Sequence, residues 1–150
     1  LYIYNFYFIF KTFKKGKHND GNEHNILVGT HGEMTGIIDF GDMVYSFQVV
    51  EPSVAMAYAA LKHSEPYDAV STLLRGYHSV YPLRESELAA SIYLMCTRLC
   101  ITVCMAAWRK KLFPDNSYLT ISETSAWDLL RNMQKEDLAG WSDRLIQYAR

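Results

Sequence analysis

Three polar side chains near the start of the chain have the types and spacing of a magnesium site with a general base. Asp20 and Asn25 lie five residues apart in a turn-rich stretch, and Asp39 follows nineteen residues after Asp20. Carboxylate and amide oxygens are ligands that Mg²⁺ prefers, together with water and phosphate. If the intervening residues form a hairpin, Asn25 and Asp39 flank one spot, and Asp20 faces it as an anionic base.

The same residues fit two motifs of phosphoryl transfer. His18, Asp20 and Asn25 match the pattern H-x-D-x-x-x-x-N with its spacing kept, and residues 39–41 match D-F-G. Either motif alone recurs by chance, whereas both in this order, with a hairpin between them, indicate a kinase-like site. Asn25 and Asp39 would hold Mg²⁺ against nucleotide phosphates, and Asp20 would accept the proton of the acceptor hydroxyl.

Three neighbouring residues are expected to have supporting roles or none in this scheme. His18 belongs to the catalytic motif, but the scheme gives it no reacting partner, so we expect it to brace the loop. Asp42 is expected either to hydrogen-bond the catalytic loop or to assist the metal. For His24, a solvated loop side chain is expected rather than a phosphate contact.

A small β element and a set of helices must position these residues. Apolar runs at 26–28 and 36–38, joined by a Gly-containing turn, predict a hairpin. Farther along, apolar residues recur at helical spacing, with Ser86 as an expected N-cap. The predicted helices cover residues 51–61, 67–81, 85–111, 121–134 and 137–149. The expected fold class is therefore α+β and mainly helical.

Composition excludes several classes of function. The 150 residues are 49% apolar and 21% charged, with a net charge of −1. The chain therefore lacks the excess of basic residues that would indicate binding to nucleic acid or to a membrane. Cys96, Cys100 and Cys104 share one helix face but lack the four ligands of a structural zinc site. We expect them to be free core thiols in a reducing, cytoplasmic compartment. The Tyr and Trp residues over 93–141 are expected mostly in the core, with Trp108 a candidate for a substrate pocket.

The first sixteen residues differ in composition from the rest. Residues 1–10 are nearly all apolar, yet they are too few to cross a bilayer, which takes about 20 residues. They also lack the basic region and small-residue cleavage site of a signal peptide. We therefore interpret residues 1–16 as an atypical leader and residues 17–150 as the functional domain.

At the two motifs the chain resembles the aminoglycoside phosphotransferase family, the choline kinase-like small-molecule kinases. Protein kinases usually place Arg between the His and Asp of the catalytic loop, whereas this chain has Asn19 and the small-molecule kinases have a small or polar residue. The hydroxylysine kinase branch is the part of the family that the chain resembles over residues 18–28, 38–46, 95–107 and 114–130. Lys17 departs from the family, which usually has an apolar residue there.

The resemblance implies a protein kinase-like fold, of which this chain would be the C-terminal lobe. The N-terminal lobe, with its phosphate-covering loop and strand Lys, has no counterpart before His18, which implies a missing lobe or a fusion. The resemblance also implies Mg²⁺-dependent transfer of a γ-phosphoryl group from GTP, or ATP, to the hydroxyl of 5-hydroxy-L-lysine.

A cationic amino-acid substrate calls for acidic neighbours and for a partner to its carboxylate. Glu51 is a candidate for the first role, although a carboxylate is also favoured at a helix N-terminus. Arg98 is a candidate for the second, although it could equally pair with an acidic residue inside the helical bundle.

Three hypotheses stay open at this point. The chain could belong to a hydroxylysine kinase, or to a kinase of another amino alcohol such as choline, ethanolamine, an aminoglycoside or homoserine. It could also be a non-catalytic fragment that acts as an interaction module. The expected partners are a nucleotide and a small-molecule substrate, without nucleic acid or membrane.

Overall fold

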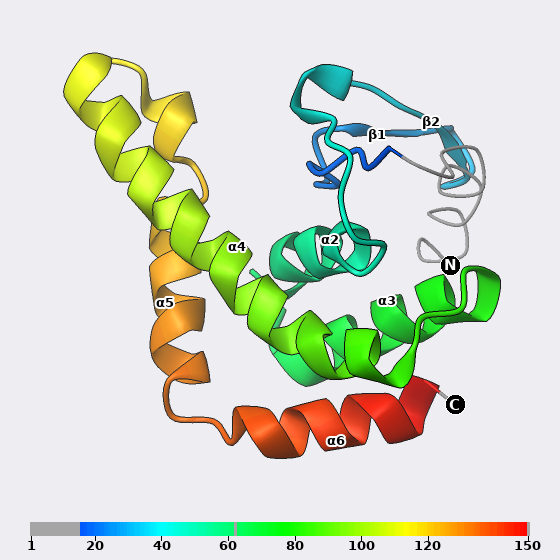
Figure 1. Cartoon of the computed structure of the whole chain (residues 1–150). Coiled ribbons are helices and arrows are strands. Elements are labelled where there is room, and N and C mark those ends of the chain that lie inside the picture. The colour runs from blue at the N-terminus through cyan, green and yellow to red at the C-terminus, as the bar shows by residue number, and fades with distance from the viewer. Residues whose placement is uncertain (1–15, 62, 150) are drawn as a thin grey trace.

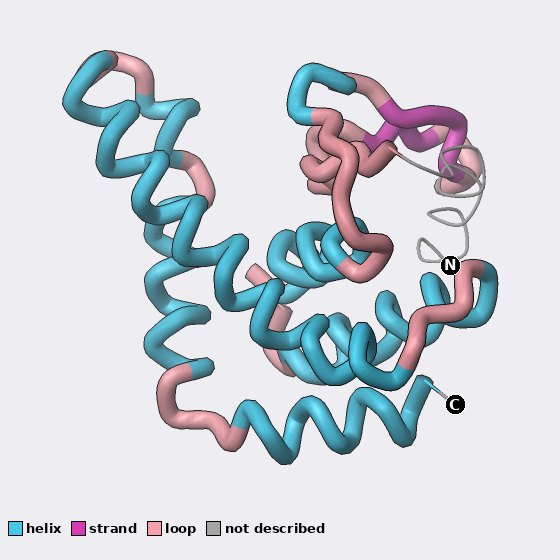
Figure 2. The backbone as a smooth tube through the Cα atoms, viewed as in Figure 1, coloured by secondary structure: helices cyan, strands magenta, loops and turns pink. Residues whose placement is uncertain are grey.

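The fold combines one small sheet with a set of packed helices. A computed structural model describes residues 16–61 and 63–149, and Figure 1 shows the hairpin on one side and the long helix α4 running across the molecule. Figure 2 shows how few residues are in strands. The predicted leader over residues 1–16 lies, apart from Gly16, outside the described residues. The expected mainly helical α+β class is confirmed, while the two-lobed kinase architecture stays a prediction.

The β-hairpin lies where the sequence predicts it. Strands β1 (Ile26–Val28) and β2 (Met34–Ile37) are antiparallel, with Ile26 opposite Ile37 and a register shift after Leu27. Gly32 has a φ of 81° in the turn, a backbone conformation that glycine adopts without steric cost. The second strand begins two residues earlier than predicted. The hairpin brings its two ends together because the Ile38 N–H donates to the Asn25 carbonyl at 2.9 Å.

A second pairing fixes the segments on either side of the hairpin. The chain turns through a short 3-10 helix, η1 (Phe40–Asp42), directly after β2. Lys17 and Val44 then form an antiparallel bridge, with N–H to carbonyl distances of 2.8 and 3.0 Å. This bridge holds the residues before the catalytic loop against those after η1, so the two motifs lie side by side.

Five helices follow, close to the predicted boundaries. Helix α4 packs against α2, α5 and α6, and α3 packs against α2 and α6. A short 3-10 helix, η2, precedes α5 and also contacts α4. The helices are α2 (Val50–Ala60), α3 (Pro66–Val80), α4 (Glu85–Leu112), α5 (Glu123–Met133) and α6 (Leu138–Ala149), with η2 at Ser117–Thr120.

The expected N-cap of the longest helix is wrong by two residues. The N-cap of α4 is Arg84 rather than Ser86. The Glu87 carboxylate accepts hydrogen bonds from the backbone N–H of Arg84 at 3.0 Å and from its Nε at 3.3 Å. A Glu three residues into a helix commonly closes the first turn in this way, so the helix starts one residue before Ser86.

The prediction that all three cysteines lie in the core is wrong for two of them. The thiols are free, but Cys96 is half-buried and Cys100 and Cys104 are exposed. The buried stripe of α4 consists instead of apolar side chains at helical spacing, which are Leu88, Ile92, Met95, Leu99, Val103 and Ala106. The cysteines occupy the next stripe around the helix, which borders the core at Cys96 and then faces outward.

The aromatic residues over 93–141 are also less buried than predicted. Trp141 is in the core with 6% exposed, whereas Trp108 is 55% exposed and lies outside the cavity described below. The other exposed members are Tyr93, Tyr118 and Trp127. Tyr93 and Trp108 on α4 and Trp127 on α5 are therefore exposed, although both helices also contribute apolar side chains to the core.

Helix α4 is also long and apolar enough to cross a membrane by length and composition alone. Its most apolar 18-residue window has a mean hydropathy of 1.8, and 33% of that window is buried. Core helices of soluble proteins meet the same criterion, and α4 packs on three other helices here.

Truncating the centre of the core should destabilise the fold. Leu74 on α3 is fully buried, so Leu74→Ala is expected to lower the free energy of unfolding by about 2–5 kcal/mol through lost burial and a cavity. Leu112→Ala removes the same atoms at a position that is 51% exposed, and a change within about 0.5 kcal/mol is expected. Urea denaturation of both variants measures the difference. Equal losses would place Leu74 outside the core.

Candidate active site

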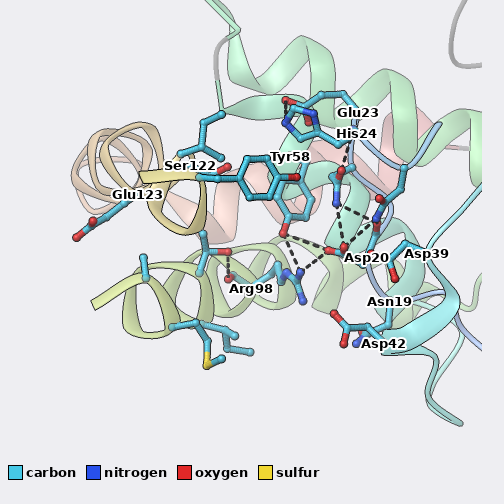
Figure 3. A pocket seen from close by; sticks show the side chains of 18 of the residues that line it. Asn19, Asp20, Glu23, His24, Asp39, Asp42, Tyr58, Arg98, Ser122 and Glu123 are labelled. Carbon is cyan, nitrogen blue, oxygen red and sulfur yellow. Dashed lines mark hydrogen bonds and ion pairs between the residues drawn. The ribbon is translucent and has the colours of Figure 1, made fainter. Parts of the chain in front are cut away.

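One cavity brings the residues of both sequence motifs together. It has a volume of about 490 Å³ and is lined by Asp20, Asn25, Asp39, Asp42 and Arg98, among others. Its walls come from the catalytic loop, the start of η1, one face of α4 and residues 118–123, which are far apart in the sequence. Figure 3 shows Asp20, Asp39 and Asp42 on the same side of this cavity. His18 and Glu51 do not line it.

Asp20 is the most connected side chain in the cavity. Its Oδ2 accepts from the amides of Asn22 at 3.0 Å and Asn25 at 2.8 Å. Its Oδ1 accepts from Nη2 of Arg98 at 2.8 Å and from the Tyr58 hydroxyl at 3.3 Å. These contacts fix the carboxylate in one orientation, which suits a group that must face an acceptor hydroxyl.

Tyr58 joins α2 to this network. Its hydroxyl accepts from Nη2 of Arg98 at 2.7 Å and donates to Asp20. Burial raises the pKa of Tyr58, partly offset by the charge of Arg98. The phenol therefore stays protonated at neutral pH and remains a donor to Asp20.

Asn25 and Asp39 have the donor atoms that a magnesium ion needs. The Asn25 amide nitrogen donates to the Asp20 carboxylate and to its carbonyl at 2.9 Å, so its amide oxygen is the atom left for a ligand. The Asp39 side chain also lines the cavity, and one of its oxygens accepts from the Gly41 N–H at 3.4 Å. Mg²⁺ usually binds one or two protein oxygens and takes its other ligands from water and phosphates. The residues present fit that pattern.

The described residues contain no group of three His, Cys, Asp or Glu side chains that could hold a metal by themselves. The predicted Mg²⁺ site has one carboxylate, from Asp39, and one amide oxygen, from Asn25, so it differs from such a three-residue group. Asp42 adds a further carboxylate on the same side of the cavity, and it makes no hydrogen bond or ion pair with the described residues. Both expected roles of Asp42, a hydrogen bond to the catalytic loop and assistance to the metal, stay predictions.

Two residues at the site have left-handed backbone conformations. Asn19, between His18 and Asp20, has a φ of 62°, and Asp39 has a φ of 63°. Asn and Asp tolerate this region better than other non-glycine residues, and such conformations concentrate at functional sites. Both residues line the cavity, as does Asp20, which follows Asn19.

His18 lies behind the catalytic loop, and its expected role as a brace stays a prediction. Its ring is buried with 4% exposed, and Nε2 bonds to the carbonyl of Ile38 at 2.9 Å. The ring also packs edge-on against Phe40 at 5.1 Å between centroids. His18 therefore connects the two motifs from behind the cavity wall.

Glu51 lies beneath the catalytic loop, not in the cavity. It is 1% exposed, and its two carboxylate oxygens accept from the Asn19 N–H at 3.3 and 3.4 Å. This position does not offer the contact with a substrate that the sequence allowed. It supports the strained residue next to Asp20 instead, and Lys17, also buried, contributes a nearby positive charge.

The buried carboxylate should make stability depend on pH. Burial raises the pKa of Glu51 above its usual 4.5, against the opposing effect of the Asn19 N–H. A raised pKa means that Glu51 contributes stability while protonated, below pH 4.5, and loses that contribution as the pH rises through the folded-state pKa. Gln keeps an acceptor for Asn19 but cannot ionise. Glu51→Gln should therefore gain stability relative to wild type from pH 4 to pH 7.

Urea denaturation at several pH values measures this difference. Glu65→Gln replaces an exposed carboxylate and provides the matched control, for which no trend relative to wild type is expected. If wild type instead gained stability over Glu51→Gln as the pH rose, Glu51 would be ionised in the folded protein at acidic pH, and the assignment would be wrong.

Several residues of the cavity were not found from the sequence. Tyr58 reads as an apolar member of a helical repeat, and its hydroxyl gives no signal of its own. Arg109 on α4 and residues 118–123 lie far from both motifs. His24 does line the cavity, half-exposed, and its ring packs against Tyr118 at 6.3 Å between centroids.

Comparison with known proteins identifies a matching family and several similar proteins. Residues 17–88 match the model of the phosphotransferase enzyme family. Hydroxylysine kinase of Mus musculus is 35% identical over 126 residues, and that of Bos taurus is 33% identical over 125 residues. The matches cover 77% of this chain but 33% of each relative, so the chain spans about a third of the length of these proteins. No solved structure matches the chain.

The matched region contains both motifs and the residues that join them, from the Lys17 bridge to the start of α4. Residues 17–88 match the phosphotransferase enzyme family, and the chain is similar to proteins named hydroxylysine kinase.

Proposed function

We propose that this chain carries the catalytic and metal-binding residues of a kinase that phosphorylates the hydroxyl of 5-hydroxy-L-lysine, with Mg²⁺ and GTP. The observation that carries the proposal is the meeting of Asp20, Asn25 and Asp39 around one cavity. The similarity to relatives named hydroxylysine kinase supports the choice of acceptor. GTP as the donor and the cytoplasm as the location come from the family resemblance of the sequence.

Each residue has a defined part in this proposal. Mg²⁺, held by Asn25 and Asp39, would neutralise charge on the nucleotide phosphates. Asp20 orients the acceptor hydroxyl and takes its proton as the oxygen attacks the γ-phosphorus. The bond between the γ-phosphorus and the bridging oxygen breaks, and GDP leaves. Because the transferring group concentrates negative charge, positioning and charge neutralisation supply most of the rate enhancement. Asn25 links the two functions, since its amide nitrogen is bound to Asp20.

The test is an acceptor screen with the full-length gene product and Mg²⁺, using GTP and ATP in parallel. Phosphorylated products are identified by mass spectrometry. Phosphorylation of 5-hydroxy-L-lysine is expected, with none on L-lysine, which differs only in lacking the hydroxyl. Preferential phosphorylation of choline, ethanolamine, homoserine or an aminoglycoside would refute the acceptor. Calorimetric titration with Mg·GTP that gave no heat would favour the non-catalytic alternative.

A further inference from the structure

The carboxylate of Asp20 has no acceptor position left for a substrate. An ionised carboxylate offers about four lone-pair positions. Four donors occupy them in the described structure: two loop amides on Oδ2, and Arg98 and Tyr58 on Oδ1. An acceptor hydroxyl must therefore displace one of these donors before Asp20 can receive its proton.

The two donors on Oδ2 are poor candidates for displacement. Asn22 and Asn25 belong to the same short loop as Asp20, and each also donates to the Asp20 carbonyl, at 3.2 and 2.9 Å. Removing either amide would break the loop that shapes the site. The donors on Oδ1 come from helices α2 and α4, and both line the cavity from its other side (Figure 3).

Arg98 is held incompletely in this arrangement. Only Nη2 of its guanidinium bonds within the described part of the chain, and Nε is buried there without a partner. A buried, unpaired donor costs about 1–3 kcal/mol. A guanidinium can instead bind a carboxylate through two parallel hydrogen bonds, which are among the strongest in proteins. Arg98 would therefore gain from a second anion in the cavity.

We propose that Arg98 is a latch on Asp20 that the carboxylate of the acceptor opens. Without an acceptor, Nη2 occupies Oδ1 and blocks the base. A bound amino acid draws the guanidinium onto its own carboxylate, and the position that Nη2 occupied on Oδ1 becomes free for the acceptor hydroxyl. Tyr58, which contacts both partners, keeps Asp20 oriented during the exchange. Only hydrogen bonds and one ion pair change, so the step needs no further reactant.

The latch would make the enzyme selective for hydroxyl acceptors that carry a carboxylate. An amino alcohol without this group can enter the cavity, but it leaves Arg98 on Asp20. This inference rests on the proposed function, because it assumes that Asp20 is the base. The latch concerns how one class of acceptor is selected. The latch and the proposed function can therefore fail separately.

The test compares 5-hydroxy-L-lysine with the amine formed by removing its carboxylate. Wild-type full-length gene product is expected to prefer the amino acid by about 10- to 100-fold in kcat/KM, the value of one charged hydrogen-bonding pair. In Arg98→Met the kcat/KM for the amino acid should fall, and that for the amine should rise because the base is no longer blocked. In Arg98→Met the kcat/KM values for the amino acid and the amine should then differ by no more than about threefold.

Two further variants separate the latch from general damage to the site. Arg109→Met removes another cation that lines the cavity from α4 without any contact to Asp20, and it should keep the wild-type preference. Arg98→Lys retains the charge but loses the planar fork, so a smaller loss of preference in the same direction is expected. Circular dichroism tests whether each variant is folded. If Arg98→Met is not folded, the preference measured for Arg98→Lys is used to test the latch.

Each outcome decides between the two ideas. If 5-hydroxy-L-lysine is phosphorylated and Arg98→Met lowers both acceptors equally, the latch is refuted and the kinase stands. If neither acceptor is phosphorylated, the proposed acceptor is wrong. The latch is then tested by calorimetric measurement of the binding of L-lysine and of its decarboxylated amine. Carboxylate-dependent binding that disappears in Arg98→Met supports it, whereas equal binding of the two ligands, or none, overturns it.

Discussion

Replacing Asp20 by Asn is expected to lower kcat for phosphoryl transfer by about 10²- to 10⁴-fold, with the affinity for Mg·nucleotide close to that of wild type. Asn has the same shape and can still accept from Arg98 or Tyr58, but it cannot take a proton. The metal ligands expected to hold the nucleotide, Asn25 and Asp39, are unchanged. Steady-state kinetics of the full-length gene product, together with calorimetric titration of Mg·GTP, measures both effects.

Folding must be checked for this variant, because Asn leaves the partly buried charge of Arg98 without its ion-pair partner. Glu23→Gln is the matched control. Glu23 is on the same loop and lines the same cavity, but it makes no contact with Asp20, so kcat within about twofold of wild type is expected. Parallel losses of kcat and of nucleotide affinity in Asp20→Asn would contradict a base role and indicate a metal ligand instead.

The elements that carry the motifs could be predicted because their signals are local. A Gly-containing turn between two short apolar runs is sufficient to predict a hairpin, and that prediction places Asn25 near Asp39. Helical periodicity gave the five helices with small errors at their ends. The predicted N-cap of α4 was wrong because residue type alone favours Ser86. The contact that fixes the start of the helix comes instead from Glu87, three residues into the helix, which accepts from the Arg84 N–H.

The contacts around Asp20 could not be predicted, because they depend on how helices cross. Arg98 lies 78 residues from Asp20 in the sequence, and nothing in its own neighbourhood indicates which acid it meets. Tyr58 belongs to the helical repeat of α2, which makes it look like a core residue. Only the packing of α2 against α4 shows its hydroxyl at the base.

Burial was the other quantity that sequence patterns did not determine. Glu51 has the position of a carboxylate that favours a helix N-terminus, yet tertiary packing turns it under the catalytic loop with 1% exposed. Conversely, Cys100 and Cys104 follow helical spacing perfectly but lie on a stripe of α4 that no other described element covers. Periodicity defines which residues share a face, whereas packing decides which face is inside.

Asp39→Ala is expected to weaken Mg²⁺-dependent nucleotide binding by at least about 100-fold. Loss of a residue that only orients a metal ligand typically costs 10- to 100-fold in metal affinity, and Asp39 is proposed as a direct ligand. The measurement is calorimetric titration of GTP into the full-length gene product with Mg²⁺ and, separately, with EDTA. Only the Mg²⁺-dependent part of the affinity should disappear.

The backbone at this position demands a second variant. Asp39 has a φ of 63°, where an alanine side chain is strained by roughly 1–2 kcal/mol, so Asp39→Ala also disturbs the turn into η1. Asp39→Asn tolerates the same conformation and can still accept from the Gly41 N–H, while it removes the charge. Loss of Mg²⁺-dependent binding in both variants identifies the carboxylate as the cause. If Asp39→Asn and Asp39→Ala both bind Mg·GTP like wild type, the proposed magnesium site is wrong.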